Sequence, residues 1–414
     1  MYVSAECCIF AVLNLNDMKS KLFEIAPLLP LAVCLMAGIV VGRYVSLPVS
    51  WWFLLSGGVV VTLLLWRFVH LQTLGIILCF VFLGAAMMER QHPAEGHPQS
   101  EASQDSRLSR SRTFFLHQRD RLLHRLSDGG LEGDAYAVVA AMALGDKSAL
   151  TKDLRETYSV TGASHVLALS GLHLGIIYML LSLLVLGRRR RMFSQLFLIV
   201  SIWGFVFLVG MSMSVVRAAI MISVYALLSL GHRDKMSVNT LAFTAIVMLM
   251  VHPLSLFDVG FQLSFMAVFS ILVWYPFFEG LIPQPFLMSH RLVKWLWTML
   301  AVSCAAQLGT APLVAYYFGR FSTLFLITNL VVIPTATLIL YLALLVLIVP
   351  SLAYLLNNIV TFLNTFLDRM TALPCASIEG LHPSVLQTIM VYVVIAAVYM
   401  IIDRIYSVSR ILLK

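Results

Sequence analysis

Residues 161–175 read TGASHVLALSGLHLG, and they open an apolar run that continues to Leu186. The stretch holds two histidines, three hydroxyl side chains and three glycines. Polar groups cost free energy at membrane depth, so a chain that keeps them beside a hydrophobic run generally uses them. The stretch therefore predicts a membrane helix with a polar mouth.

The composition extends this prediction to the whole chain. Of its 414 residues, 60% are hydrophobic and only 12% are charged, whereas a soluble domain carries roughly 25% charged residues. The mean hydropathy is +0.91. We therefore expect an all-α polytopic membrane protein, a bundle of roughly 10–12 transmembrane helices with short interfacial or broken helices.

Apolar runs long enough to approach the thickness of a bilayer, which needs about 20 residues per helix, mark the candidate spans. They are 27–45, 51–68, 71–88, 164–186, 193–211, 215–230, 237–251, 259–278, 292–310, 323–349, 352–373 and 385–402. The segment 134–145 is apolar but short, and we interpret it as interfacial or re-entrant. Polar breaks are expected at 307–312 and 326–334, and 313–318 is too short to span.

Basic residues predict the orientation, because cytoplasmic loops are enriched in Lys and Arg. An N-terminus on the inside brings four basic clusters to the cytoplasmic side: Lys19 and Lys21; Arg188, Arg189, Arg190 and Arg191; His232, Arg233 and Lys235; His290, Arg291 and Lys294. The first residues do not resemble a cleavable signal, and both Met1 and Met18 are candidate starts.

Six arginines fall on the outside in this scheme: Arg107, Arg110, Arg112, Arg119, Arg121 and Arg125. One interpretation is an amphipathic interfacial helix over 113–126, with Phe115, Leu122 and Leu126 on one face. The other is an outer basic surface that receives a polyanion. The two interpretations are compatible.

Ser170 and His173 are three residues apart, so they share a helix face. They could serve as nucleophile and base, but no GxSxG or HExxH motif is present. A structural or pore-lining polar seam, in which Gly171 lets helices approach closely, is the favoured interpretation. His165, just before the apolar run, is either a structural hydrogen-bonding group or part of a wet vestibule. The six cysteines are scattered without CxxC spacing. We predict no catalytic group, no metal site and no cofactor.

Other polar groups occur at the starts or in the middle of later apolar runs. Arg217 either extends to the lipid headgroups or faces the bundle interior and meets an anion. Asp258 is a candidate helix N-cap or a partner of Arg217. With Gln262, Gln307 and Asn329, these residues suggest a bundle with a polar interior, as a pathway for a hydrophilic solute requires.

Three blocks of sequence resemble the ComEC family of membrane proteins. The first runs from ALGDKS (143–148) to Thr161, His165 and SGLH (170–173); the second from Arg217 through Asp258 to GFQLSF (260–265); the third from Gln307 through Asn329 to Pro334. The resemblance covers close to half of the chain and implies import of one DNA strand through a multi-helix channel. It carries over the positions His165, Ser170, His173, Arg217, Asp258, Gln262 and Asn329.

The chain departs from the fuller family pattern in two places. Only a polar stretch at 89–133 occupies the position of an OB-fold domain, and no metallo-β-lactamase-like HxHxDH cluster is present. The expected organisation is N-terminal transmembrane helices at 1–88, a polar loop with a basic amphipathic helix at 89–133, a ComEC-like membrane domain at 134–349 and C-terminal transmembrane helices at 350–414. No hydrolytic activity is predicted, so strand degradation would need a separate nuclease.

The leading hypothesis is a channel that imports single-stranded DNA across the bacterial cytoplasmic (inner) membrane during competence and transformation. The expected partners are DNA, bound through its phosphate backbone without sequence preference, the lipid bilayer, a DNA receptor outside and a helicase-like motor inside. The alternative is a transporter or flippase for a small anionic or lipid-linked solute. An intramembrane hydrolase that uses Ser170 and His173 is the third hypothesis.

Overall fold

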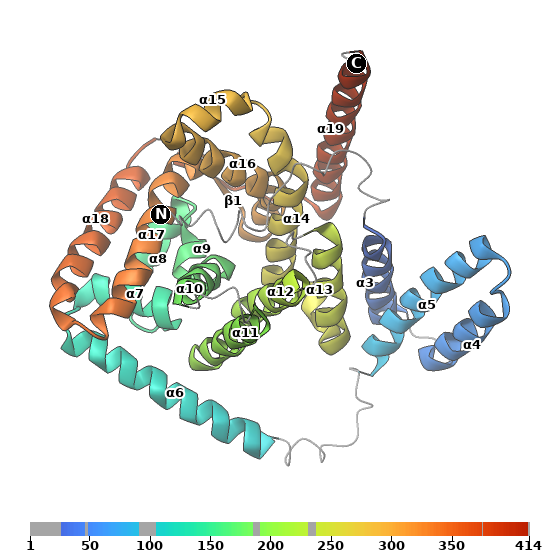
Figure 1. The fold of residues 1–414 in the computed structure, drawn as a ribbon, viewed down its shortest axis with the longest axis horizontal. Helices are drawn as coiled ribbons and strands as arrows, with labels where there is room; N and C mark the ends of the chain where they lie inside the picture. The colour runs from blue at the N-terminus through green and yellow to red at the C-terminus, as the bar shows by residue number, and fades with distance from the viewer. Residues whose placement is uncertain are drawn as a thin grey trace. The chain divides into compact units, whose positions relative to one another are not determined.

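The structure is a computed structural model that describes residues 26–45, 49–90, 105–184, 191–230, 237–374 and 376–412. The described residues form 17 α-helices and two short strands (Figure 1). The α-helices are α3 (Leu28–Tyr44), α4 (Trp51–Leu64), α5 (Val69–Glu89), α6 (Asp105–Asp128), α7 (Gly133–Leu144), α8 (Lys152–Val160), α9 (Ser164–Leu167), α10 (Gly171–Leu184), α11 (Arg191–Leu208), α12 (Met213–Leu230), α13 (Val238–Val251), α14 (Val259–Glu279), α15 (Gln284–Ser289), α16 (Arg291–Phe318), α17 (Phe325–Val346), α18 (Ala353–Thr371) and α19 (Val385–Leu412). The strands are β1 (Arg320–Ser322) and β2 (Ser377–Glu379), and two 3-10 helices, η2 (Pro253–Phe257) and η3 (Pro350–Leu352), complete the fold.

The helices confirm the predicted all-α membrane class. Among the described residues, five helices are long and apolar enough to cross a membrane: His70–Glu89, Val259–Glu279, Arg291–Phe318, Phe325–Val346 and Val385–Ile405. Seven shorter apolar helices accompany them: Leu28–Tyr44, Trp51–Leu64, Gly133–Leu144, Gly171–Leu183, Met192–Leu208, Met213–Leu227 and Val238–Val251.

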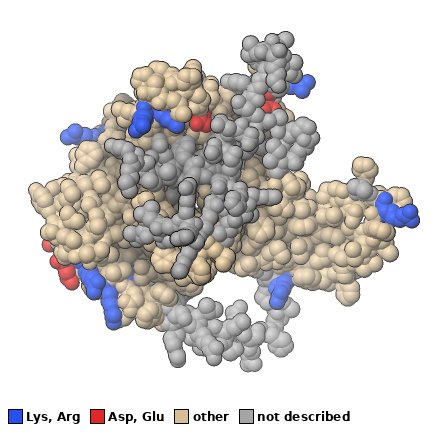
Figure 2. Space-filling model, in the orientation of Figure 1, with Lys and Arg blue, Asp and Glu red and all other residues tan. Residues whose placement is uncertain are grey.

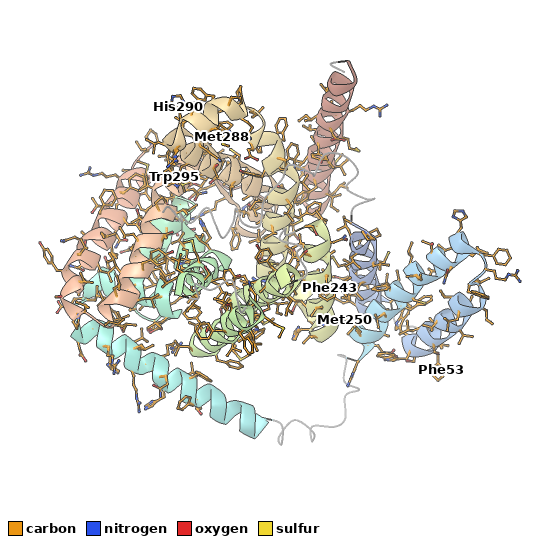
Figure 3. The ribbon with its side chains drawn as sticks, in the orientation of Figure 1. Phe53, Phe243, Met250, Met288, His290 and Trp295 are labelled. Carbon is orange, nitrogen blue, oxygen red and sulfur yellow. The ribbon has the colours of Figure 1, made fainter. Side chains whose placement is uncertain are left out.

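Apolar side chains cover much of the outside of these helices. Phe53 on α4 is 73% exposed, and Phe243 and Met250 on α13 are also exposed (Figure 3). The face shown in Figure 2 is mostly uncharged, with Lys, Arg, Asp and Glu confined to a few places. A soluble protein would not present so many large apolar groups to water, so this surface is suited to lipid.

The chain divides into two compact units, each with its own packing. Within the described ranges, the first unit comprises residues 112–219 and 266–412, and the second comprises residues 26–111 and 220–265. The polar segment 161–175 and the strands belong to the first unit.

Helix α7 is the centre of the first unit's core. From Ala137 to Leu144 every one of its residues is buried. It packs with α17 and α18, whose buried residues include Val332, Ala336 and Val360. A helix apolar on all sides is stable only inside protein or lipid, so α7 is a core element and not an amphipathic surface helix.

Helix α6 and the C-terminal end of α7 both lie against the C-terminal end of α11. On α6, Phe115 stacks on Phe207 with ring centroids 5.5 Å apart, and Gly145 after α7 lies against Val209. The turn between α6 and α7 lies near the end of α17, where a Cβ added to Gly129 would be 3.5 Å from Cγ1 of Val346.

Helices α17 and α18 form a second hairpin, which is closed at both ends. The turn η3 joins them at one end, and at the other β1, just before α17, pairs antiparallel with β2, just after α18. Helix α18 therefore covers the same distance as α17, although it is not among the helices apolar enough to count as a candidate span. One of its faces is buried through Leu356, Leu363 and Leu367.

The second unit is built on close contact between α3 and α5. A side chain at Gly38 or Gly42 of α3 would collide with the backbone of Val81 or Ala85 on α5, so only glycine permits this approach. Glu89, the last residue of α5, accepts hydrogen bonds from the Ser50 hydroxyl and the Trp51 amide, at 2.9 and 3.0 Å, and so caps α4.

Three sequence predictions about helix continuity are wrong. The span predicted at 164–186 is divided into α9 and α10, with Ala168 in an extended conformation between them. The break predicted at 307–312 is absent, because α16 continues through Pro312 to Phe318 and includes the segment judged too short to span. The break at 326–334 is also absent, because α17 runs without interruption through Pro334.

Proline is tolerated within these helices because neighbouring helices can compensate for the lost backbone hydrogen bond. Pro312 removes the donor to the carbonyl of Leu308, and the hydroxyl of Tyr392 on α19 donates to the adjacent carbonyl of Gly309 at 2.7 Å. Packing in the bundle thus decides helix continuity where sequence pattern alone predicts a stop.

Several of the charges that predicted the orientation lie outside the described residues. They are Lys19, Lys21, Arg188, Arg189, Arg190, His232, Arg233 and Lys235. Cys7, Cys8 and Cys375 also lie outside them. The described cysteines Cys34, Cys79 and Cys304 are free thiols.

Candidate functional site

The polar side chains Ser170 and His173 of the 161–175 segment form the N-terminal cap of α10. Ser170 directly precedes α10, and its carbonyl accepts the first helical hydrogen bond, from the Leu174 amide at 3.3 Å. The backbone amide of Ser170 donates to Nδ1 of His173 at 3.3 Å, and Oγ of Ser170 lies 3.0 Å from the same nitrogen. Here His173 occupies the position that Glu or Gln takes in a capping box.

This geometry fixes the proton on the imidazole ring of His173. A backbone N–H can only donate, so Nδ1 accepts and the neutral ring carries its proton on Nε2. Nε2 is buried and has no hydrogen-bond partner among the described residues. A hydrolytic triad would need an orienting group at that nitrogen, so the arrangement favours the structural interpretation of the Ser170–His173 pair.

His165 lies apart from this cap, on α9. Its Nδ1 is 3.1 Å from the carbonyl of Gly162, and its side chain is exposed. Gly162 has φ +80°, a left-handed conformation that favours glycine, and an added Cβ would lie 3.0 Å from Cβ of Ser322. The turn before α9, which carries His165, is therefore held against the end of β1 and the start of α17.

Arg217 is a buried charge on α12, only 3% exposed. The next residue, Ala218, packs against Gly171 at the first turn of α10, where an added Cβ would lie 3.5 Å from Cβ of Ala218. Burial inside the chain disfavours extension to lipid headgroups, which would leave the guanidinium exposed. The structure thus brings Arg217 beside the capped end of α10.

Gln307 and Asn329 lie on the neighbouring helices α16 and α17 and are partly buried. Nδ2 of Asn329 donates to Oγ of Ser303 on α16 at 3.4 Å. Its Oδ1 is buried without a hydrogen-bond partner in the described part of the chain, as is Oγ1 of Thr328. Sequence reasoning identified Asn329 but missed Ser303 and Thr328, whose hydroxyls give no motif signal inside an apolar run.

Asp258 and Gln262 belong to the second unit and serve the start of α14. Oδ2 of Asp258 accepts from the Phe261 amide at 3.1 Å, which is the predicted N-cap role. Nε2 of Gln262 donates to the carbonyl of Leu256 at 3.0 Å. Phe261 and Phe265, in the first two turns of α14, stack on each other with ring centroids 4.3 Å apart.

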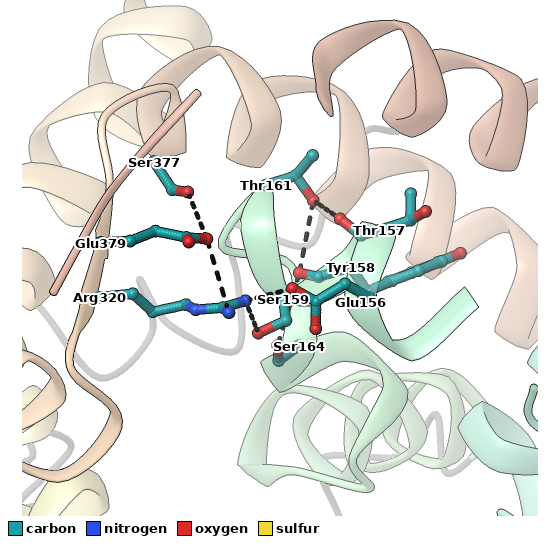
Figure 4. A network of polar contacts seen from close by, with 9 residues as sticks. All are labelled: Glu156, Thr157, Tyr158, Ser159, Thr161, Ser164, Arg320, Ser377 and Glu379. Carbon is teal, nitrogen blue, oxygen red and sulfur yellow. Dashed lines mark hydrogen bonds and ion pairs between the residues drawn. The ribbon is translucent and has the colours of Figure 1, made fainter. Parts of the chain in front are cut away.

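A polar network that sequence did not predict joins three distant segments (Figure 4). Arg320 of β1 donates to Oε1 of Glu156 at 2.8 Å and to Oγ of Ser159 at 3.1 Å. The same guanidinium lies 3.5 Å from Oε1 of Glu379 on β2. No local pattern could reveal this network, because Arg320 and Glu156 are 164 residues apart.

Helix α8 is also tied to α18, through the residues between Glu156 and Ser159. The hydroxyl of Tyr158 donates to Oδ1 of Asn364 at 2.9 Å, and Thr157 donates to Asp368 at 3.1 Å. Burial, and to a lesser degree the charges of Asp368 and Asp134, raise the pKa of Tyr158. Tyr158 therefore remains a neutral hydrogen-bond donor, and α8 is anchored both to the strands and to α18.

The basic amphipathic helix predicted at 113–126 is confirmed as part of the longer α6. Leu126 is 1% exposed and Leu122 packs against the core, while Arg121 and Arg125 are exposed. Arg119 is partly buried and lies 3.4 Å from Asp120. Arg107, Arg110 and Arg112 are within α6, but their side chains lie outside the described residues.

No group of three or more His, Cys, Asp or Glu side chains that could hold a metal ion occurs within the described ranges. The first unit instead holds six of the predicted site residues: His165, Ser170, His173, Arg217, Gln307 and Asn329. Buried polar and charged side chains within apolar helices define a polytopic membrane protein with a polar interior.

Residues 142–405 match the family described as Competence protein. The match covers more than half of the chain, and the chain therefore belongs to this family. It includes all eight residues predicted for the pathway, but it starts after the arginines of α6.

Curated relatives agree over the same region. ComE operon protein 3 of Bacillus subtilis (strain 168) is 31% identical over 212 residues, which is 50% of this chain and 25% of that protein. An uncharacterized protein of Aquifex aeolicus (strain VF5) is 31% identical over 201 residues, 48% of this chain and 45% of that protein. The uncharacterized protein YcaI of Escherichia coli (strain K12) is 23% identical over 211 residues, 49% of this chain and 28% of that protein.

The aligned region therefore spans a quarter to just under half the length of these relatives. No solved structure matches the chain significantly.

Proposed function

We propose that this chain imports single-stranded DNA across the bacterial cytoplasmic membrane as a channel of the competence machinery. The observation that carries the proposal is the family match over residues 142–405, since that region contains the buried polar cluster around α10, α12 and α17. The name of the relative from Bacillus subtilis also associates this sequence with a competence operon. A small-solute transporter or flippase has no comparable support.

The proposed mechanism follows from the placement of charge. Exposed arginines of α6, such as Arg121 and Arg125, attract the phosphate backbone, an attraction that weakens with salt and ignores sequence. Within the bundle, the buried guanidinium of Arg217 offers a phosphate fixed donors in a low-dielectric site. His165, His173, Gln307 and Asn329 supply neutral polar groups that replace water around the strand.

The orientation and partners are part of the same proposal. The N-terminus lies inside, and the chain is a multi-pass protein whose four predicted regions keep the boundaries given above. No NTP-binding motif is visible in the sequence, so a helicase-like motor inside supplies the driving force. A receptor outside delivers the DNA, and a separate nuclease degrades the second strand where degradation occurs.

The test is the arrival of labelled DNA in the cytoplasm of a competent host that lacks this gene. The wild-type chain is expected to restore arrival, and Arg217→Ala at equal membrane level is expected to lower it by at least about tenfold, because a buried charged hydrogen bond is worth about 1.5–3 kcal/mol. Arg369→Ala, which removes an exposed arginine of the same unit, is the matched control and should behave like wild type.

Normal arrival of DNA in the deletion strain would contradict the channel proposal. Saturable transport of a small anion that depends on Arg217 would then support the transporter alternative.

A further inference from the structure

Among the buried polar atoms of the first unit without a hydrogen-bond partner in the described ranges, Nε of Arg119 lies on α6 and four others lie on two segments that pack together. The four others are Nε2 of His173, Oγ of Ser322, Oγ1 of Thr328 and Oδ1 of Asn329. His173 and Thr328 are fully buried, and Ser322 is 8% exposed. Such atoms are rare in folded proteins, and each one calls for a specific explanation.

These atoms lie on two segments that face each other. One segment is 162–173, and the other is 322–329. Gly162 touches Ser322 and Phe325 directly, and both α9 and α10 pack against α17. All four atoms belong to these two segments, which we call the polar seam, and the amide of Asn329 also extends to Ser303 on α16.

A buried polar atom without a partner destabilises the conformation that contains it, because the atom has lost its hydrogen bonds to water. A conformation in which the seam parts would return partners to all four atoms at once. The atoms are neutral: one N–H donor, one carbonyl acceptor and two hydroxyls that can do either. This set can bind water, a phosphate oxygen or the edge of a base.

We propose that the polar seam is the closed gate of the channel and that segments 162–173 and 322–329 part to admit the DNA strand with its water. The inference rests on the proposed function, and it assigns the place of opening within it. Two interactions that lie outside the seam keep it closed. They are the Arg320 network and the Tyr158–Asn364 hydrogen bond. The strand is recognised through neutral hydrogen bonds here, and through charge at Arg217.

The first test is Thr328→Val, which replaces the hydroxyl by a methyl group of similar size. Because the closed state loses an unpartnered polar atom, this variant should unfold at a temperature roughly 2 °C higher in detergent. The open state becomes less populated, so DNA should arrive about tenfold more slowly. The combination of higher stability and lower uptake is specific to a gate.

The matched control is Thr335→Val on the same helix. Oγ1 of Thr335 already donates to the carbonyl of Val331 at 2.7 Å, so it is not part of the seam. Its substitution should leave uptake unchanged. Uptake at the wild-type rate in Thr328→Val, or a lower unfolding temperature, would overturn the gate while the wild-type complementation still supports the channel.

The second test does not depend on the rate of uptake. Single cysteines are placed by Ser322→Cys, Thr328→Cys and Val332→Cys in a chain whose six native cysteines are replaced by alanine. A membrane-impermeant cationic thiol reagent is added to cells that are taking up DNA. The first two variants should react at least about tenfold faster than Val332→Cys, which is equally buried but apolar. Equal rates at all three positions would show that the seam does not open.

Discussion

His173 serves the fold with one ring nitrogen and faces the interior with the other. Nδ1 accepts the amide of Ser170 and so completes the start of α10, while Nε2–H remains buried without a partner among the described residues. The SxxH spacing could be predicted to place the two side chains together, but sequence could not decide between a nucleophile–base pair and a helix cap. That decision required the backbone conformation at Ala168, where the helix is interrupted.

The cap formed by Ser170 and His173 predicts how substitutions of His173 change the stability of the protein. His173→Ala should lower the free energy of unfolding by about 1 kcal/mol, the usual value of an N-terminal cap. His173→Gln should retain most of the stability, because Gln is an ordinary capping-box residue that accepts the same hydrogen bond. Thermal unfolding of both variants in detergent is the measurement, and an equal loss in both would contradict the capping role.

At the scale of elements, the close pairing of helices depends on glycines that the hydropathy pattern does not distinguish. Gly309 of α16 faces α14, and an added Cβ would lie 2.5 Å from Cβ of Ser270 and 2.6 Å from the carbonyl of Met266. The hydroxyl of Ser270 donates across the same contact to the carbonyl of Ala305 at 2.6 Å. Sequence predicted a polar break near Gly309, but the glycine is there to admit another helix.

Gly309→Ala should therefore force α14 and α16 apart and cost about 1–3 kcal/mol, as overpacking of a filled interior generally does. Gly204→Ala on α11 is the matched control, because no atom lies within 4 Å of the added methyl group. That substitution should be neutral or should stabilise the helix by up to about 1 kcal/mol. The comparison uses unfolding temperatures of the two purified variants, and a milder effect at Gly309 than at Gly204 would refute the packing argument.

At the scale of the whole molecule, the apolar runs were sufficient to predict most of the helices. The basic clusters were sufficient to predict an orientation. They could not pair distant segments, as in the contact of Arg320 with Glu156 or the antiparallel strands β1 and β2. With the N-terminus inside, the predicted spans would leave 145–163, 319–322 and 374–384 on the outside. The contacts of Gly162 with Ser322, and of Arg320 with Glu156 and Glu379, join these three loops, as one common side requires.

The orientation itself yields the last prediction, for single cysteines in a chain without native ones. Lys147→Cys and Ile378→Cys, both at exposed positions, should react with an impermeant thiol reagent applied to intact spheroplasts. Ser289→Cys, at an exposed position beside the basic pair Arg291 and Lys294, should react only after the membrane is opened. The reverse labelling pattern would show that the orientation in the membrane is opposite to the predicted one, with the Arg320 network on the cytoplasmic side. Labelling of Lys147→Cys and Ile378→Cys from opposite sides would contradict the Arg320 network, which joins α8 to β1 and β2 on one side of the membrane.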